Sequence, residues 1–171
     1  MALRIGINGF GRIGRQVVRA GIERGAPLEF VAVNDITDAA TLAHLLRYDS
    51  VHGTWTPAAG TTADGHLRVG EGTLRVMSEK DPAKLPWRSL GVDVVLEATG
   101  KFTDRDGGAL HLAAGARNVL VSAPAKGADL TFVFGVNDRA FDPTKHKVVS
   151  IGSCTTNCLA PVAKVLNDAF R

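Results

Sequence analysis

A glycine-rich turn near the N-terminus constrains the fold of this chain more than any other feature of its sequence. The apolar run 3–8 is followed by Gly9, Gly11 and Gly14 in the spacing G-x-G-x-x-G, and the residues after them have the apolar periodicity of a helix. Between a strand and a helix, the first glycine permits a tight turn, the second lets the backbone approach a pyrophosphate, and the third lets helix and strand pack closely. The pattern therefore predicts a parallel α/β sheet that binds a dinucleotide.

A second apolar run, 29–34, ends at Asp35. This position is about twenty residues past the glycines, where an acidic residue accepts hydrogen bonds from the adenine-side ribose in such sheets. A carboxylate there would repel a 2′-phosphate, and the next residues contain a second acid, Asp38, and no arginine. The sequence therefore favours NAD over NADP. The alternative is that Asp35 is a turn residue that caps the next helix, although Thr37 or Asp38 is the better candidate for that cap.

The remainder of the chain alternates between helix and strand patterns. An alternating segment at 65–78 is typical of a hairpin, which would be inserted into the α/β unit. We expect further helices over 37–47, 104–116 and 159–166, a helical turn over 82–87, a loop over 49–60, and strands over 92–98, 118–122, 130–135 and 148–151. This order predicts an α/β fold of the Rossmann type, a doubly wound and mostly parallel sheet with an inserted hairpin. Because ligands bind beyond the carboxyl ends of parallel strands, Thr99 and Gly100 are expected to face the cofactor.

A cysteine follows the last predicted strand and precedes the last predicted helix. Cys154 is then expected at a helix N-terminus, where unpaired amides and the helix dipole stabilise a thiolate. Its neighbours Ser153 and Thr155 are hydroxyl residues, which suit an anionic substrate group and are poor choices for an apolar core. The alternative is a small buried cysteine, which is common for an isolated residue of this type. The polar neighbours favour a nucleophile.

Composition excludes several other classes of protein. The chain has 171 residues, of which 45% are hydrophobic and 22% charged, enough for one domain with a core but not for two full domains. The net charge of +3 comes from scattered Lys and Arg, so no nucleic-acid partner is predicted, and Arg19 is interpreted as part of a solvated helix face. Two cysteines make neither a disulfide framework nor a zinc site, so we expect no metal and a reducing compartment. No apolar segment approaches ~18 residues and no signal region is recognisable, so a cytoplasmic protein that is not inserted in a membrane is expected.

Six motifs in this order carry a resemblance to a known family. They are Ile7–Arg15 (INGFGRIGR), Asn34–Asp35, Tyr48–Gly53 (YDSVHG), Glu97–Gly100 (EATG), Ser122–Lys126 (SAPAK) and Ser153–Cys158 (SCTTNC). Together they resemble phosphorylating glyceraldehyde-3-phosphate dehydrogenase, and the last motif is specific to this family and the similar erythrose-4-phosphate dehydrogenases. One departure is Ser150-Ile151-Gly152, where members of the family commonly read Ser-Asn-Ala.

The resemblance implies an NAD-dependent oxidation of glyceraldehyde 3-phosphate to 1,3-bisphosphoglycerate in glycolysis, through a thioester on Cys154 that inorganic phosphate releases. It implies a homotetramer, an NAD-binding domain over 1–152, and a catalytic domain of which 153–171 is the first helix and the remainder is absent from the chain. The implied cofactor-binding residues are Asn8, Gly9, Phe10, Gly11 and Gly14 in the dinucleotide loop, Arg12 and Ile13 at the pyrophosphate, Asp35 at the ribose, Lys80 near the adenine, and Thr99 and Ser122 near the ribose or nicotinamide. Ser153 and Thr155 would line the anion site. Alternatives are an inactive NAD-binding fragment, a redox-sensing thiol protein, or an erythrose-4-phosphate dehydrogenase.

Overall fold

The computed structural model describes residues 2–57 and 59–170, so the parts of the sequence predictions that fall on Met1, Ala58 and Arg171 lie outside the described residues. Within the described residues, nine strands form one sheet in the order β10-β11-β9-β8-β1-β2-β7-β6-β5, and β3 and β4 form a separate hairpin. The strands are β1 (Leu3–Asn8), β2 (Leu28–Asn34), β3 (Tyr48–Asp49), β4 (Gly53–Thr54), β5 (Ala59–Thr61), β6 (Leu67–Val69), β7 (Gly72–Met77), β8 (Val94–Glu97), β9 (Asn118–Val121), β10 (Leu130–Thr131) and β11 (Val148–Ser150). The helices are α1 (Arg12–Glu23), α2 (Ala39–Arg47), α3 (Arg105–Ala113) and α4 (Cys154–Phe170), with short 3₁₀ turns at Pro82–Lys84 and Asp138–Ala140.

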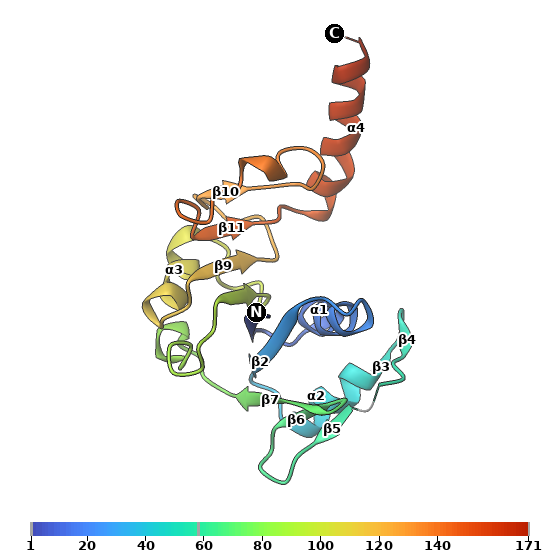
Figure 1. Ribbon diagram of the computed structural model, residues 1–171, viewed down its shortest axis with the longest axis vertical. Helices are drawn as coiled ribbons and strands as arrows, with labels where there is room; N and C mark the ends of the chain where they lie inside the picture. Colours follow the sequence, from blue (N-terminus) through green and yellow to red (C-terminus); the bar gives the residue numbers. More distant parts are fainter. Residues whose placement is uncertain (1, 58, 171) are drawn as a thin grey trace.

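The sheet is doubly wound, as the sequence predicts. From β1 the chain builds outward through β2 to β7, and it then returns to the other side of β1 with β8, β9 and β11. All neighbouring pairs between β10 and β7 are parallel, whereas β7, β6 and β5 are antiparallel. Helix α2 lies against β5 and β6, and α3 lies against β9, so the two halves of the sheet have their own helices (Figure 1). The direction of building reverses between β1 and β8.

The central strands are buried on both faces, as parallel strands covered by helices must be. Leu96 of β8 and its register partner Ile7 of β1 belong to one apolar cluster, which also contains Val18 of α1. The adjacent residue Val95 points to the opposite face and belongs to a second cluster around Trp87. The unbroken apolar runs of the sequence are therefore explained by two cores, one on each side of the sheet.

The segment predicted as a loop over 49–60 contains regular structure, so that prediction is wrong in part. Strands β3 and β4 pair in it, and β5 begins at Ala59 and adds a third antiparallel strand to the predicted hairpin. Hydrogen bonds from the amides of His52 and Val51 to the Asp49 carboxylate hold the turn between β3 and β4, and they hold the pKa of Asp49 well below its ordinary value. Strands of two residues are too short to give an alternating pattern. The predicted hairpin itself is present, but β7 also pairs with β2 in the main sheet.

The strand predicted over 130–135 is shorter than expected. It ends at Thr131, because the backbone then turns away from the sheet. The amide of Val133 donates to the Asn137 side chain, and the carbonyl of Val133 accepts from the amides of Val136 and Asn137. Just before it, the Asp129 carboxylate accepts hydrogen bonds from the amides of Lys147 and Val148 and from Arg105 of α3. Burial raises the pKa of Asp129, but these hydrogen bonds outweigh it and leave the pKa below its ordinary value. Asp129 therefore ties β11 to α3.

Arg19 is not part of a solvated helix face. It is 4% exposed, and its guanidinium donates to the carbonyls of Leu46, at 2.9 and 2.6 Å, and of Gly53, at 3.2 Å. It also lies 5.9 Å from the centre of the Trp55 ring. The carbonyl of Leu46 is at the C-terminal end of α2, where a cation is favoured by the helix dipole. Arg19 thus joins α1 to the end of α2.

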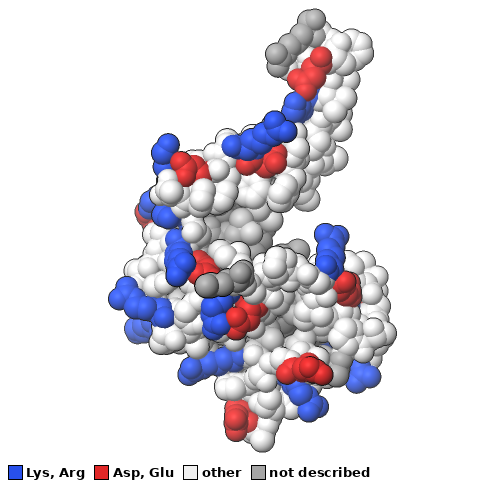
Figure 2. Space-filling view, viewed as in Figure 1, with Lys and Arg blue, Asp and Glu red and all other residues white. Residues whose placement is uncertain are grey.

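Helix α4 begins at Cys154 and runs to Phe170, earlier and later than the predicted 159–166, with Pro161 inside it. None of its residues is buried, and it extends away from the sheet (Figure 1). Its exposed large apolar side chains are Leu159, Val162, Val165, Leu166 and Phe170. Figure 2 shows acidic and basic side chains interspersed over the body of the molecule, whereas much of α4 is uncharged on this face. Among the described residues, no helix combines the length and apolar character needed to cross a membrane.

Candidate functional site

A cleft opens at the carboxyl ends of the central strands, where the direction of sheet building reverses. It has a volume of about 630 Å³, within the range of ligand-binding pockets. This edge of a doubly wound sheet is where such folds bind ligands. The residues that line the cleft are Asn8, Gly9, Gly11, Asn34, Asp35, Ile36, Thr37, Glu79, Lys80, Ala98, Thr99, Lys101 and Phe102.

Glycine occupies the three positions of the N-terminal motif for three different structural reasons. Gly9 has a φ of +92°, and a Cβ there would lie 2.6 Å from the Thr99 backbone nitrogen. A Cβ on Gly14 would lie 2.5 Å from the Gly9 carbonyl oxygen, so this glycine allows α1 to pack on the turn. Gly11 differs, because a Cβ there would meet nothing within 4 Å. Gly11 is therefore not needed for packing, and it leaves the backbone open toward the cleft.

The start of α1 adds backbone donors to this wall of the cleft. Gly11 is the N-cap of α1 and supplies no capping side chain, and the first intrahelical hydrogen bond is donated by the Arg15 amide. The amides of the first turn of a helix have no intrahelical partner and attract negatively charged groups. The wall next to Gly11 is therefore suited to an anionic group such as a phosphate.

Asp35 lies at the end of β2 on the wall of the cleft. One carboxylate oxygen accepts from the Phe10 amide at 2.8 Å, and the other accepts from the Thr37 amide at 3.0 Å. A carboxylate has about four lone-pair sites, so each oxygen keeps capacity for a donor from a ligand. The alternative interpretation of Asp35 as a helix cap is wrong, because Asp38 caps α2 by accepting from the Thr41 amide.

The structure brings together six of the predicted cofactor residues at the cleft, namely Asn8, Gly9, Gly11, Asp35, Lys80 and Thr99. Others lie beside it. The Phe10 side chain is buried in the core and Gly14 packs under the turn, while Arg12 points away to Asp49 and Ser50, and Ile13 is about half exposed. Gly100 follows Thr99 with a φ of +71° and is exposed, but it is not among the lining residues.

Sequence reasoning missed Asn34, Ile36, Thr37, Glu79, Ala98, Lys101 and Phe102, which also line the cleft. A signal for Asn34 was present. Asn8, Asn34 and Glu97 are polar residues at the carboxyl ends of apolar runs, and these three residues are buried. Because parallel strands end at one edge of the sheet, polar residues at such positions are expected to meet there.

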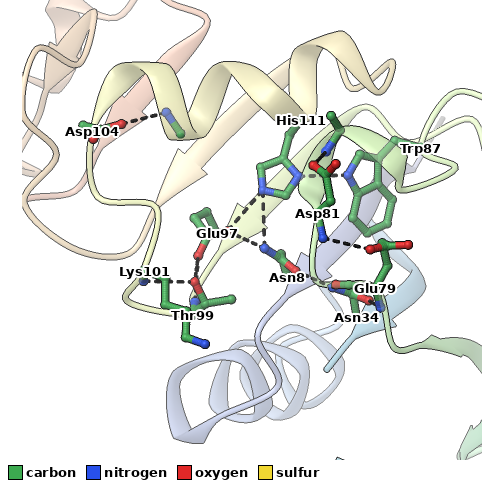
Figure 3. Close-up of polar contacts among 12 residues, drawn as sticks. Asn8, Asn34, Glu79, Asp81, Trp87, Glu97, Thr99, Lys101, Asp104 and His111 are labelled. Atoms are coloured by element: carbon green, nitrogen blue, oxygen red, sulfur yellow. Dashed lines mark hydrogen bonds and ion pairs between the residues drawn. The ribbon is translucent and has the colours of Figure 1, made fainter. Parts of the chain in front are cut away.

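These buried polar residues form one connected network (Figure 3). The Asn8 amide nitrogen donates to Glu97 at 2.6 Å, and the Asn34 amide nitrogen donates to Asn8 at 2.7 Å. On the other side, His111 of α3 contacts Glu97 at 3.1 Å and accepts from the Trp87 indole at 3.0 Å. His111 is fully buried. The network crosses the ends of β8, β1 and β2 at the floor of the cleft.

Cys154 lies at the same edge of the sheet as the cleft but does not line it. It is the first residue of α4 and is exposed, so the alternative of a buried cysteine is wrong. It follows β11, which is three strands from β1 in the sheet, or about 14 Å at ~4.8 Å per strand. Ser122 follows β9, between β11 and β8, and its amide donates to the Glu97 carbonyl. Ser122 therefore lies between the cysteine and the cleft.

The residues around Cys154 fix the start of α4. Ser153 Oγ accepts from the Thr156 amide at 3.0 Å, which is the contact of a helix N-cap, whereas Thr155 is exposed. The Asn157 side chain donates to the carbonyls of Ile151 and Ser153. The Cys154 thiol is therefore exposed to solvent at a helix N-terminus that Ser153 caps and the Asn157 side chain holds in place.

The cleft suits a dinucleotide. Asp35 would hold a ribose diol, the first-turn amides of α1 would hold the pyrophosphate beside Gly11, and Thr99 would contact the part of the ligand nearest β8. When bound, a nicotinamide dinucleotide would serve as the hydride acceptor.

Comparisons with known proteins agree on one family. Residues 3–105 match the family model of the glyceraldehyde 3-phosphate dehydrogenase NAD binding domain. The chain is 55% identical over 169 residues to glyceraldehyde-3-phosphate dehydrogenase 1 of Streptomyces avermitilis, covering 99% of this chain and 50% of the relative. It is 54% identical over 170 residues to glyceraldehyde-3-phosphate dehydrogenase of Geobacillus stearothermophilus, with the same coverage. It is 57% identical over 166 residues to glyceraldehyde-3-phosphate dehydrogenase of Kitasatospora aureofaciens, covering 96% of this chain and 49% of the relative. The chain spans about half the length of these curated relatives. It belongs to the glyceraldehyde 3-phosphate dehydrogenase family, through the domain that binds NAD.

Proposed function

We propose that the chain supplies the NAD-binding half and the nucleophile of a phosphorylating glyceraldehyde-3-phosphate dehydrogenase, whose activity belongs to the complete protein. The observation that carries the proposal is the juxtaposition of a dinucleotide cleft and an exposed cysteine at one edge of the same parallel sheet. The relatives that bear this enzyme name are more than half identical to the chain over almost its whole length.

In this proposal Cys154 is the covalent catalyst. Its sulfur, exposed at the start of α4, attacks the aldehyde carbon of glyceraldehyde 3-phosphate and forms a hemithioacetal. Hydride then leaves this carbon and a proton leaves its hydroxyl group, so that a thioester forms, and a bound nicotinamide dinucleotide would supply the hydride acceptor. Inorganic phosphate then attacks the resulting thioester carbonyl, the bond to Cys154 Sγ breaks, and the product leaves as an acyl phosphate. Thr155, exposed at the start of α4, and Ser153 would line the site of the attacking anion.

The domain division and the assembly are parts of the same proposal. Residues 1–152 would form the NAD-binding domain, and 153–171 would form the first helix of a catalytic domain. The exposed apolar face of α4 supports this division, because a helix with no buried residues needs a further partner to cover it. A cytoplasmic homotetramer is the proposed setting.

Replacing the nucleophile tests the proposal. In the complete protein, Cys154→Ser should abolish NADH formation from glyceraldehyde 3-phosphate and phosphate while NAD binding by titration stays intact. Cys158→Ser, one helical turn further along α4, is the matched control and should keep most of the turnover. Full dehydrogenase activity in Cys154→Ser would overturn the assignment.

The choice of cofactor is tested separately at Asp35. Since the carboxylate would repel a 2′-phosphate, NAD should bind more tightly than NADP, and Asp35→Ser should narrow this difference. Equal affinities in the unmodified protein would overturn the argument. Erythrose 4-phosphate, assayed in parallel, tests the related substrate.

A further inference from the structure

Behind the residues that form the floor of the cleft lies a buried carboxylate whose partners mostly cannot accept hydrogen bonds. Glu97 is 2% exposed, and its Oε1 contacts the backbone nitrogen of Thr99 at 2.8 Å and Thr99 Oγ1 at 2.5 Å. Its Oε2 contacts the amide nitrogen of Asn8 at 2.6 Å and Nε2 of His111 at 3.1 Å. Both oxygens therefore meet two partners each (Figure 3).

The tautomer of His111 follows from its other neighbour. The indole nitrogen of Trp87 can only donate, and it lies 3.0 Å from Nδ1 of His111. Nδ1 must then be the acceptor, so the ring proton of a neutral His111 is on Nε2 and is donated to Glu97. The 3.5 Å contact between His111 Nε2 and the Asn8 amide nitrogen consequently joins two donors and is not a hydrogen bond.

The network has a second chain of hydrogen bonds, or arm, that reaches Glu97 through Asn34 and Asn8 and also ends with a donor. The Glu79 amide donates to Asn34 Oδ1 at 2.8 Å, Asn34 Nδ2 donates to Asn8 Oδ1 at 2.7 Å, and Asn8 Nδ2 donates to Glu97. Reversing either side-chain amide would place two donors or two acceptors in contact. Both arms thus end with donors directed at Glu97, and bonds in such chains polarise one another.

We propose that Glu97 is an ionised positioning residue that fixes the polarity of the Thr99 hydroxyl on the cleft wall. A proton on Oε2 would face two donors, and a proton on Oε1 would have to be donated to Thr99 Oγ1, which already accepts from the Lys101 amide. With Glu97 ionised, Thr99 Oγ1 donates its one proton to Oε1 and accepts from the Lys101 amide at 3.1 Å. Toward the cleft this hydroxyl then offers only a lone pair.

The consequence is a preference in what the cleft binds at this wall. An acceptor-only hydroxyl takes a ligand hydroxyl or amide N–H and rejects a phosphate oxygen or a carbonyl oxygen. Glu97 acts through Thr99 and does not itself line the cleft. This inference rests on the proposed function, since the ligand used to test it is NAD.

Binding measurements with a pair of Thr99 variants test the inference first. Thr99→Val removes the hydroxyl with little change of shape and should weaken NAD binding about tenfold, the cost of roughly one hydrogen bond. Thr99→Ser keeps the hydroxyl and should stay within about twofold of the unmodified protein. NAD affinity in Thr99→Val equal to that of the unmodified protein would overturn the inference.

A double-mutant cycle tests whether Glu97 acts through Thr99. Glu97→Gln should weaken NAD binding by a similar factor, and adding Thr99→Val to Glu97→Gln should weaken NAD binding little further. Fully additive losses of affinity would contradict the proposal that Glu97 acts through Thr99. Glu71→Gln, the same change at an exposed residue of the β6–β7 turn, is the matched control and should leave NAD affinity unchanged.

Infrared difference spectroscopy reads the ionisation state without any ligand. In the spectrum of Thr99→Val minus the unmodified protein, loss of the hydrogen bond should shift a carboxylate stretching band. A shifted carbonyl band of a protonated carboxyl group would overturn the inference even if NAD binds. Absence of NAD binding by the unmodified protein would instead reject the proposed function, with the infrared result still deciding the state of Glu97.

Discussion

Gly11→Ala should remove most of the NAD affinity of the cleft while leaving the stability of the fold almost unchanged. The residue has ordinary dihedral angles, φ −67° and ψ −166°, and a Cβ built on it meets nothing within 4 Å. Alanine is a poorer N-cap than glycine, but it also reduces the entropy of the unfolded chain by about 0.4–1 kcal/mol, and these effects oppose one another. We therefore expect the free energy of unfolding to change by less than about 1 kcal/mol.

The loss of affinity comes from the space that the methyl group would occupy. Gly11 lines the cleft beside the first-turn amides of α1, where the pyrophosphate is expected to approach the backbone. Crowding a packed contact by a methyl group costs about 1–3 kcal/mol, which corresponds to a roughly 5- to 150-fold weaker Kd. Isothermal titration with NAD measures this loss, and urea unfolding measures the stability of the same sample.

Gly14→Ala is the matched control, because its added Cβ would lie 2.5 Å from the Gly9 carbonyl oxygen. This variant should lose about 1–3 kcal/mol of stability through strain in the turn. NAD binding by Gly11→Ala as tight as that of the unmodified protein would refute the role of Gly11 at the pyrophosphate. Equal destabilisation of the two variants would refute the distinction between Gly11 and Gly14.

Other predictions address the remaining structural features. Arg19→Met should destabilise the fold by about 1.5–3 kcal/mol in urea unfolding, because it leaves buried carbonyls without their charged donor, whereas Arg12→Met at an exposed site should change stability little. The lowered pKa of Asp129 means that its ionised form is favoured in the folded state, so this contribution is present above about pH 4 and is lost as the pH falls through the folded-state pKa. The stability difference between the unmodified protein and Asp129→Asn should therefore shrink from pH 7 to pH 3, and a constant difference would contradict it. Val165→Lys on α4 should reduce self-association of the 171-residue chain in sedimentation. A monodisperse monomer of the unmodified chain would contradict the premise that the exposed apolar side chains of α4 cause self-association.

The sequence predicts those parts of the site that depend on local backbone geometry. The spacing of Gly9, Gly11 and Gly14 encodes a turn, an opening and a close packing contact within six residues, and all three are present. Asp35 is similarly local, because it follows directly from the end of a strand. The alternation of helix and strand patterns was enough to predict a doubly wound sheet.

The parts that could not be predicted depend on contacts between distant residues. Asn8 and Glu97 are 89 residues apart, and their places at the ends of apolar runs indicate a shared edge of the sheet but not which side chains form hydrogen bonds with each other. Arg19 has the local pattern of an exposed helix residue, and only the approach of the C-terminal end of α2 explains its burial. The two-residue strands β3 and β4 depend on the Asp49 carboxylate rather than on any strand propensity.

The reversal of sheet building between β1 and β8 has a consequence for the time at which the cleft appears. Register partners such as Ile5 and Val94 belong to adjacent strands but are made far apart during translation. A growing polypeptide that has completed β1, α1 and β2 already contains the glycine turn and Asp35, yet it lacks the second wall of the cleft. Closing so long a loop is among the slower steps of chain folding. Nucleotide capture should consequently begin only after β8 has inserted, and bound NAD should then retard amide exchange most strongly at the β1–β8 seam.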